Sequence, residues 1–253
     1  SGLAETSFWC SGWLGVVLRK IRDGFFLVGV AHVLPRSVEE VRRVIREERP
    51  EIVAVELCPY RYAILFGQAA PSKRPPIGNP LEFALTWILS FLQNKLAKRT
   101  GSAAGQEMIV AIEEARQIGA RVELIDQDIR ITMARLNSSM SFFERVRLSL
   151  QILASVVIPT SEMDLSQLDE EAVVEHLISG LKSLSPAAFQ VMIEERDEYM
   201  AERLIPPMLS GRRVVCVVGA GHLPGLQRRL QEALIEWEQK MWWKGTLEFE
   251  SSW

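Results

Sequence analysis

The sequence has few of the residues that most often carry metal or covalent chemistry. It contains three cysteines and three histidines among 253 residues. Cys10, Cys58 and Cys216 form no C-x-x-C pair, which argues against a thiolate zinc site or redox couple and indicates a reducing compartment. The longest apolar run, 83–92, is far shorter than the roughly 20 residues of a membrane-spanning helix. We therefore expect these residues to form a soluble unit.

The chain also lacks a large excess of positive or negative charge. The formal net charge is −3, so no strong basic field is available to attract a nucleic acid, and we expect no nucleic-acid partner. The hydrophobic fraction of 48% and charged fraction of 24% exclude extensive disorder. A chain of this length and composition can bury a substantial core.

Short apolar runs alternate with amphipathic segments along the chain. The first two runs flank Asp23-Gly24, which predicts a β-hairpin. The middle runs are almost wholly apolar, as in strands buried in parallel sheets, and the last alternates like an edge strand. We predict strands at 14–18, 25–30, 52–55, 121–125, 213–218 and 246–250.

Helical periodicity fills most of the sequence between these strands. Ser37 and Glu40 form a capping box at the start of the first predicted helix. We predict an α/β fold in which two βα-type repeats form a mixed, largely parallel sheet flanked by helices, with a helical insert. The chain is predicted to be one domain, 1–253. Its core would comprise about 12–66, 105–136 and 212–250, with the insert at about 138–210.

Two segments carry more apolar surface than a small insert needs. They are 81–96, which follows a Pro-rich loop at 67–80, and 142–158. A contiguous apolar patch of this kind is typical of an interaction surface, so we predict a homodimer contact or a membrane-facing surface there.

Polar residues follow four of the predicted strands. They are His32, Glu56, Asp126 and, after a glycine turn, His222. In a parallel sheet these ends meet at the carboxyl edge, where ligands bind in open α/β folds. The two histidines end matching Gly-x-x-His segments, which suggests an internal duplication. Two imidazoles and a carboxylate can ligate a catalytic metal or act as acid and base.

A charged residue interrupts the apolar stripe of a helix in the insert. Arg196 lies between Ile193 and Met200 on this stripe, where an unpaired guanidinium would be costly. It could form a structural ion pair with Asp126 or Glu56, or it could bind a substrate carboxylate or oxyanion. The third histidine, His176, has no such setting and is predicted to lie on the surface.

Several motifs in order along the chain resemble the TraB/PrgY (pheromone shutdown) family, which is related to the TIKI metalloproteases and the erythromycin esterase/ChaN-like superfamily. They are Gly29-Val30-Ala31-His32, Val55-Glu56-Leu57-Cys58-Pro59-Tyr60-Arg61, Leu124-Ile125-Asp126, Glu195-Arg196-Asp197 and Gly219-Ala220-Gly221-His222. Gln127 stands where many relatives have arginine, so a contact by that arginine is not expected here.

The resemblance implies a metal-dependent peptidase acting on a peptide or small protein. His32, Glu56 and His222 would hold a divalent ion (Mn, Co, Zn or Fe). The remaining residues of the implied catalytic pocket are Glu56, Arg61, Asp126, Arg135 and Arg196. Relatives often carry a membrane-spanning region after this domain, so the full-length protein is expected to be membrane-associated.

Two other functions remain open at this point. One is a non-catalytic binding module that sequesters a peptide signal, as the pheromone shutdown name suggests. The other is haem or iron binding, which the distant ChaN resemblance implies. Cleavage of peptides would exclude simple sequestration, and a featureless visible spectrum after haem addition would exclude the second function.

Overall fold

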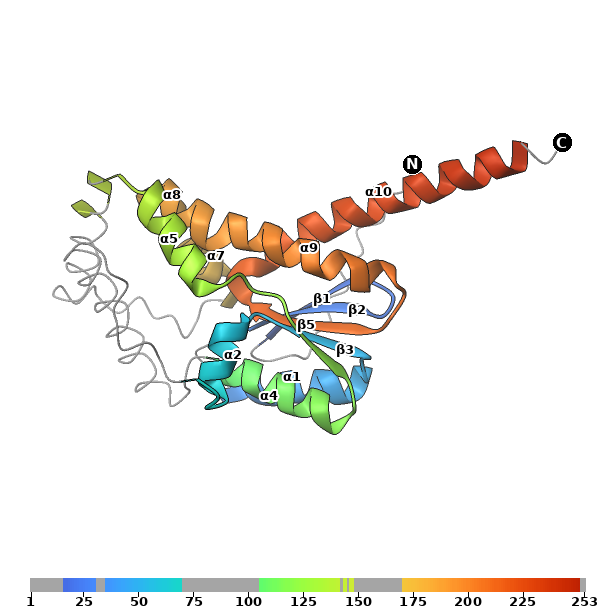
Figure 1. Ribbon diagram of the computed structural model, residues 1–253, viewed down its shortest axis with the longest axis horizontal. Coiled ribbons are helices and arrows are strands. Elements are labelled where there is room, and N and C mark those ends of the chain that lie inside the picture. Colours follow the sequence, from blue (N-terminus) through green and yellow to red (C-terminus); the bar gives the residue numbers. More distant parts are fainter. Residues whose placement is uncertain are drawn as a thin grey trace.

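A five-stranded sheet forms the centre of the protein (Figure 1). The computed structural model describes residues 16–30, 35–69, 105–141, 143–144, 146–147 and 170–250. The strands are β1 (Val16–Arg22), β2 (Phe25–Val30), β3 (Ile52–Val55), β4 (Arg121–Leu124) and β5 (Val214–Gly219). Their order across the sheet is β1-β2-β5-β3-β4, with β1 antiparallel to β2 and the other neighbours parallel. The predicted α/β class and the mixed, largely parallel sheet are confirmed.

Helices cover both faces of this sheet. The helices in the first part of the chain are α1 (Pro35–Glu48), α2 (Pro59–Leu65), α4 (Gln106–Gln117) and α5 (Ile129–Ser139). Then follow α7 (Glu170–Leu184), α8 (Pro186–Phe189), the π-helical turn η2 (Gln190–Glu194) and α9 (Glu195–Leu209). The 3₁₀ turn η3 (Ala220–His222) and the long α10 (Leu223–Glu250) come after β5.

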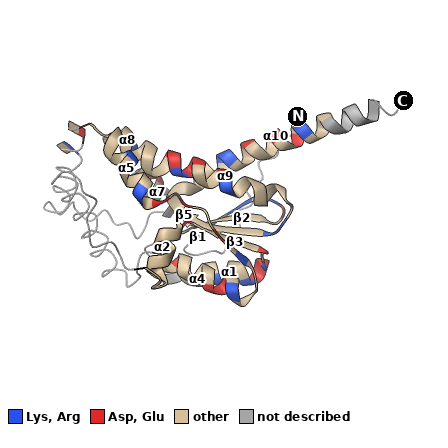
Figure 2. Ribbon diagram, in the orientation of Figure 1, with Lys and Arg blue, Asp and Glu red and all other residues tan. Residues whose placement is uncertain are grey.

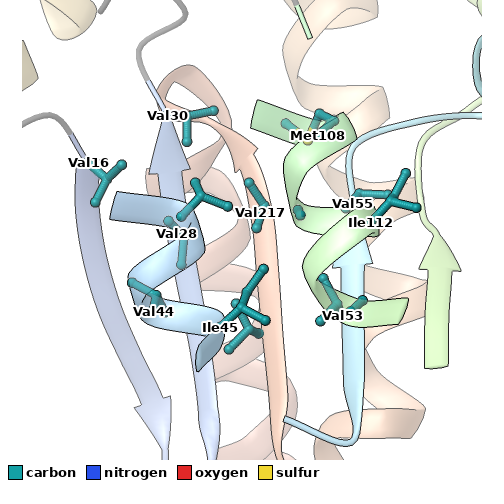
Figure 3. Close-up of a cluster of buried hydrophobic side chains, with 14 of the residues drawn as sticks. Val16, Val28, Val30, Val44, Ile45, Val53, Val55, Met108, Ile112 and Val217 are labelled. Carbon is teal, nitrogen blue, oxygen red and sulfur yellow. The ribbon is translucent and has the colours of Figure 1, made fainter. Parts of the chain in front are cut away.

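Each strand sends alternate side chains to opposite faces, which creates two apolar cores. Figure 3 shows the first core, in which α1 and α4 lie over the sheet and Ile45 and Ile112 pack against Val53 and Val217. The intervening strand residues face the other way, where Ala54 and Cys216 pack against α9 and α10. Cys216 is fully buried in this second core. Figure 2 shows that β3 and β5 carry no charged residue, in keeping with burial on both faces.

The register of the central strands brings the two Gly-x-x-His segments to one edge. Strand β2 ends at Val30, which pairs with Gly219 at the end of β5. The first glycines of the two segments, Gly29 and Gly219, do not pair with each other, because the register pairs Gly29 with Val218. A Cβ on Gly29 would lie 2.1 Å from Leu223 Cδ1. Glycine therefore lets the start of α10 pack directly against β2.

Two local predictions from the sequence are wrong. The alternating segment 246–250 is helical and belongs to α10, which continues through Gly245, because none of the five strands of the described sheet pairs with this segment. Ser37 lies inside α1, which begins at Pro35, so it is not an N-cap. Its hydroxyl instead donates a hydrogen bond to Glu107 Oε1 at 2.9 Å, joining α1 to α4.

Helix α10 extends beyond the body of the protein (Figure 1). Its exposed residues include Trp242 and Trp243, whose rings contact each other edge to face. In the part of the chain that the structure describes, no helix combines the length and apolar character needed to cross a membrane. The predicted apolar surfaces at 81–96 and most of 142–158 lie outside the described residues.

Candidate functional site

Two carboxylates project from the carboxyl edge of the sheet. Glu56 directly follows β3, and its N–H donates to Val217 O at 3.1 Å, which extends the pairing with β5. Asp126 follows β4 by two residues, and its N–H donates to Leu57 O at 3.3 Å. Both residues are less than 10% exposed. The parallel arrangement thus fixes the backbones of these carboxylates side by side, as the sequence predicts.

Arg196 of α9 lies between the two carboxylates and joins them. Its Nε and Nη2 atoms donate to the two oxygens of Asp126, both at 2.9 Å. Nη2 also donates to Glu56 Oε1 at 2.5 Å. This geometry corresponds to a bidentate arginine–carboxylate pair with a further carboxylate attached. Of the alternatives open from the sequence, the contacts favour the structural ion pair.

Four of the five N–H groups of Arg196 donate to oxygen atoms. Besides the three contacts to carboxylates, Nη1 lies 3.2 Å from Met192 O and 3.1 Å from His222 Nε2. When the imidazole is neutral, Nε2 accepts the fifth N–H; when it is protonated, this N–H has no acceptor among the described residues. The fifth N–H faces the buried His222 ring in both states.

His222 is held from both sides of its ring. Nδ1 lies 2.6 Å from Asp197 Oδ1, and Nε2 lies 3.4 Å from Glu56 Oε1. The second oxygen of Glu56 accepts the Gly219 N–H at 2.6 Å. Asp197, His222 and Glu56 therefore form a continuous buried chain, with the imidazole between two carboxylates.

The surroundings shift the pKa values of this chain in opposite directions. Burial alone would lower the pKa of His222, but the charge of Glu56 and the hydrogen bonds to Asp197 and Glu56 raise it to about 9. Burial alone would raise the pKa of Glu56, but His222 and Arg196 hold it well below its usual range. Burial raises the pKa of Asp197, although His222 opposes the shift. At neutral pH these effects favour a Glu56 carboxylate beside a protonated His222.

Asp197 was not among the candidate residues chosen from the sequence. It is 3% exposed and lies four residues after Ile193 and three before Met200, on the same apolar stripe. That position was the available signal. Asp197 shares the buried face of α9 with Met200 and Leu204.

A close approach by α10 fixes the Asp197 side chain. A Cβ on Gly225 would lie 1.9 Å from Asp197 Oδ2 and 2.8 Å from its Cγ. Only glycine leaves room for this carboxylate in its observed place. Gly225 thus positions His222 indirectly, through Asp197.

The structure separates the other predicted arginines. Arg61, in the first turn of α2, reaches the network loosely, with Nη1 3.9 Å from Asp126 Oδ2. Arg135 of α5 forms an exposed ion pair with Glu195 at 2.6 Å. In the described part of the chain, no contact links Arg135 to Glu56 or Asp126. Arg61 therefore lies beside the network and Arg135 at the surface.

The predictions for the three histidines have different outcomes. His222 is in the network, and His176 is exposed on α7, as predicted. His32 lies outside the described residues, so its predicted place beside His222 stays a prediction. Among the residues that are described, no group of three or more His, Cys, Asp and Glu side chains is arranged to hold a metal ion.

Comparison with known proteins gives a consistent set of relatives. A model of the TraB/PrgY/gumN family matches residues 17–239. An uncharacterised protein of Methanocaldococcus jannaschii is 36% identical over 234 residues, which cover 86% of this chain and 57% of that relative. The human TraB domain-containing protein is 27% identical over 232 residues, covering 80% of this chain and 61% of the relative. The chain therefore matches less than two thirds of the length of each relative.

Proposed function

The chain belongs to the TraB/PrgY/gumN family, and we propose that it is a metal-dependent hydrolase that cleaves peptide bonds at the Glu56–His222 pair. The main support is the way His222 is held. Its Nδ1 lies 2.6 Å from an Asp197 oxygen, which directs Nε2 toward Glu56 Oε1. Metal-ligating histidines typically have such a carboxylate on their second ring nitrogen.

The donor atoms present are compatible with a divalent ion. Glu56 Oε1 and His222 Nε2 are 3.4 Å apart. Ligands 2.0–2.2 Å from a tetrahedral zinc ion are separated by about 3.3–3.6 Å. These two atoms would supply two ligands, and His32 is the proposed third. A bound ion would polarise the substrate carbonyl and lower the pKa of a bound water to about 7.

In this proposal Glu56 acts as a metal ligand rather than as a general base. A general base works best with a pKa near the working pH, whereas Glu56 is held well below its usual range. An ionised carboxylate of this kind suits a ligand. In the overall reaction the water oxygen joins the carbonyl carbon, the C–N bond breaks, and a water proton passes to the leaving amine.

Arg196 restricts when the ion can bind. Its guanidinium contacts both proposed ligand atoms, at 2.5 Å from Glu56 Oε1 and 3.1 Å from His222 Nε2. These contacts would have to open, while the pair with Asp126 could persist. A ligating histidine must also be neutral, so metal binding would release the His222 proton and weaken as the pH falls.

Metal titration tests the proposal directly. Protein purified without a histidine tag would be titrated with Zn²⁺, Mn²⁺, Co²⁺ or Fe²⁺ by calorimetry. We expect one site per chain, with binding at least about tenfold weaker in Asp197→Asn and abolished in His222→Ala. His176→Ala, which removes an exposed histidine, is the matched control and should bind as the unaltered protein does. Equal binding by the His222 and His176 variants would refute the metal site.

A second experiment separates hydrolysis from sequestration. The metal-loaded protein would be incubated with a peptide library, and the masses of the products would be read over time. We expect new, shorter peptides that require both the metal and His222. Stoichiometric binding without products would favour the binding-module alternative and contradict the proposed hydrolase.

A further inference from the structure

The arginines around the site differ in whether they can still bind a ligand. Arg196 donates four of its N–H groups to oxygen atoms, and the fifth faces His222 Nε2. Arg130 of α5 forms hydrogen bonds to both oxygens of Asp128. Arg135 does the same with Glu195. A guanidinium already paired with a carboxylate has little to gain from binding a second one.

Arg61 is the exception near the carboxyl edge. Its side chain is 38% exposed, and its guanidinium lies 3.9 Å from Asp126 Oδ2, beyond hydrogen-bond distance. Asp126 is itself bound by both arms of Arg196, which neutralises much of its charge. Within the described residues, Arg61 therefore presents an accessible cation with no carboxylate of its own.

The distance from Arg61 to the proposed reaction site has a clear upper limit. Arg61 Nη1 is 3.9 Å from Asp126 Oδ2, which is 2.9 Å from Arg196 Nη2, which is 2.5 Å from Glu56 Oε1. This path is shorter than three extended residues, which span about 10 Å. A carboxylate on Arg61 and a carbonyl at Glu56 would each add a contact of about 3 Å, so the bond at Glu56 would lie within about four or five extended residues of that carboxylate.

We propose that Arg61 binds the C-terminal carboxylate of a peptide, so that the site acts near the C-terminus of its substrate. The proposal rests on the hydrolase function above and adds its substrate class. Arginine suits this role because its planar fork matches the two oxygens of a carboxylate. Hydrolysis would then release a short C-terminal fragment, with the elements of one water added across the C–N bond.

Binding measurements test this anchor without requiring catalysis. The probes are two pools of fluorescein-labelled random pentapeptides, one with a free C-terminal acid and one with a C-terminal amide. Affinities would be read by fluorescence polarisation in EDTA, so that any metal is removed and the peptides stay intact. We expect the acid pool to bind about 10- to 100-fold more tightly than the amide pool, the range for a charged hydrogen-bonded contact.

The variants assign this preference to one side chain. Arg61→Gln should reduce the acid-to-amide ratio to about one, while Arg61→Lys should retain part of it. Arg130→Gln removes a neighbouring exposed arginine that is already ion-paired, and it should leave the ratio unchanged. Thermal melting of each variant confirms that it is folded. Retention of the full preference in Arg61→Gln would overturn the proposal, and so would equal or undetectable binding of both pools by the unaltered protein.

An additional arm identifies the source of the carboxylate. An amide pool with aspartate at its last position carries the acidic group on a side chain instead of the terminus. Binding of this pool as tight as the acid pool would refute selection of the C-terminus. If the preference for the acid pool is present but no peptide is cleaved with any metal, the anchor stands and the hydrolase fails.

Discussion

Replacement of Arg196 by methionine gives the sharpest test of the buried network. Methionine keeps an unbranched apolar side chain but removes the guanidinium, whose side chain is only 11% exposed. The change leaves Glu56 and Asp126, each under 10% exposed, without their shared cation. Removing one partner of a buried ion pair typically costs about 3–5 kcal/mol. We expect a loss of stability in that range.

This loss should be easy to see by thermal unfolding. For a chain of this size, 1 kcal/mol corresponds to about 2–4 °C in Tm, so Arg196→Met should lower Tm by about 6–20 °C. Arg135→Met is the matched control, because it breaks an ion pair with Glu195 whose arginine is 52% exposed. Exposed pairs contribute about 0–1 kcal/mol, so the control should shift Tm by less than about 4 °C.

Calorimetry in EDTA at several pH values completes the assay. In Arg196→Met, Glu56 loses one of its two neighbouring cations and keeps only His222, so acid protonates Glu56 more readily than in the unaltered protein. The difference between the variant and the unaltered protein should therefore shrink as the pH falls from 7 toward 4. A Tm for Arg196→Met equal to that of Arg135→Met would refute the view that Arg196 holds the network together. An increase in Tm would do the same.

Two further predictions concern His222 and its support. Glu56 and Asp197 raise the His222 pKa to about 9, so the free energy of unfolding of the metal-free protein should fall by about 3 kcal/mol as the pH rises from 6.5 through 9. Urea denaturation measures this loss, and an equal loss in His222→Gln would contradict the prediction. Gly225→Ala would displace Asp197 from His222, so we expect a loss of about 1–3 kcal/mol and weaker metal binding, whereas Gly180→Ala, with no atom near its Cβ, should be neutral or stabilising.

The central strands could be predicted from the sequence because their signal is local. The run 52–55 is apolar at every position, and the structure gives β3 the same bounds. The predicted strand 213–218 lies one residue before β5. The segment 246–250 failed because five alternating residues also fit a helix end, and only a neighbouring strand could have made it part of the sheet.

Only the part of the site that follows from the order of the strands could be predicted from the sequence. Parallel strands must deliver Glu56 and Asp126 to the same edge, so their proximity follows from the order of elements. The place of the Asp197 carboxylate depends instead on the close approach of Gly225 of α10. The close approach of two helices is not encoded in a simple periodicity.

The roles of the arginines show most clearly what a sequence omits. Arg196 and Arg61 both qualify as anion-binding residues by type and by position near the strand ends. The difference between them lies in how many donors are already used: four bonded to oxygen atoms for Arg196, and no guanidinium hydrogen bond within the described residues for Arg61. A buried arginine whose donors are used in this way stabilises the carboxylates around it, whereas a half-exposed one has donors that are accessible to a ligand. The same residue type therefore supports two roles, and the contacts decide between them.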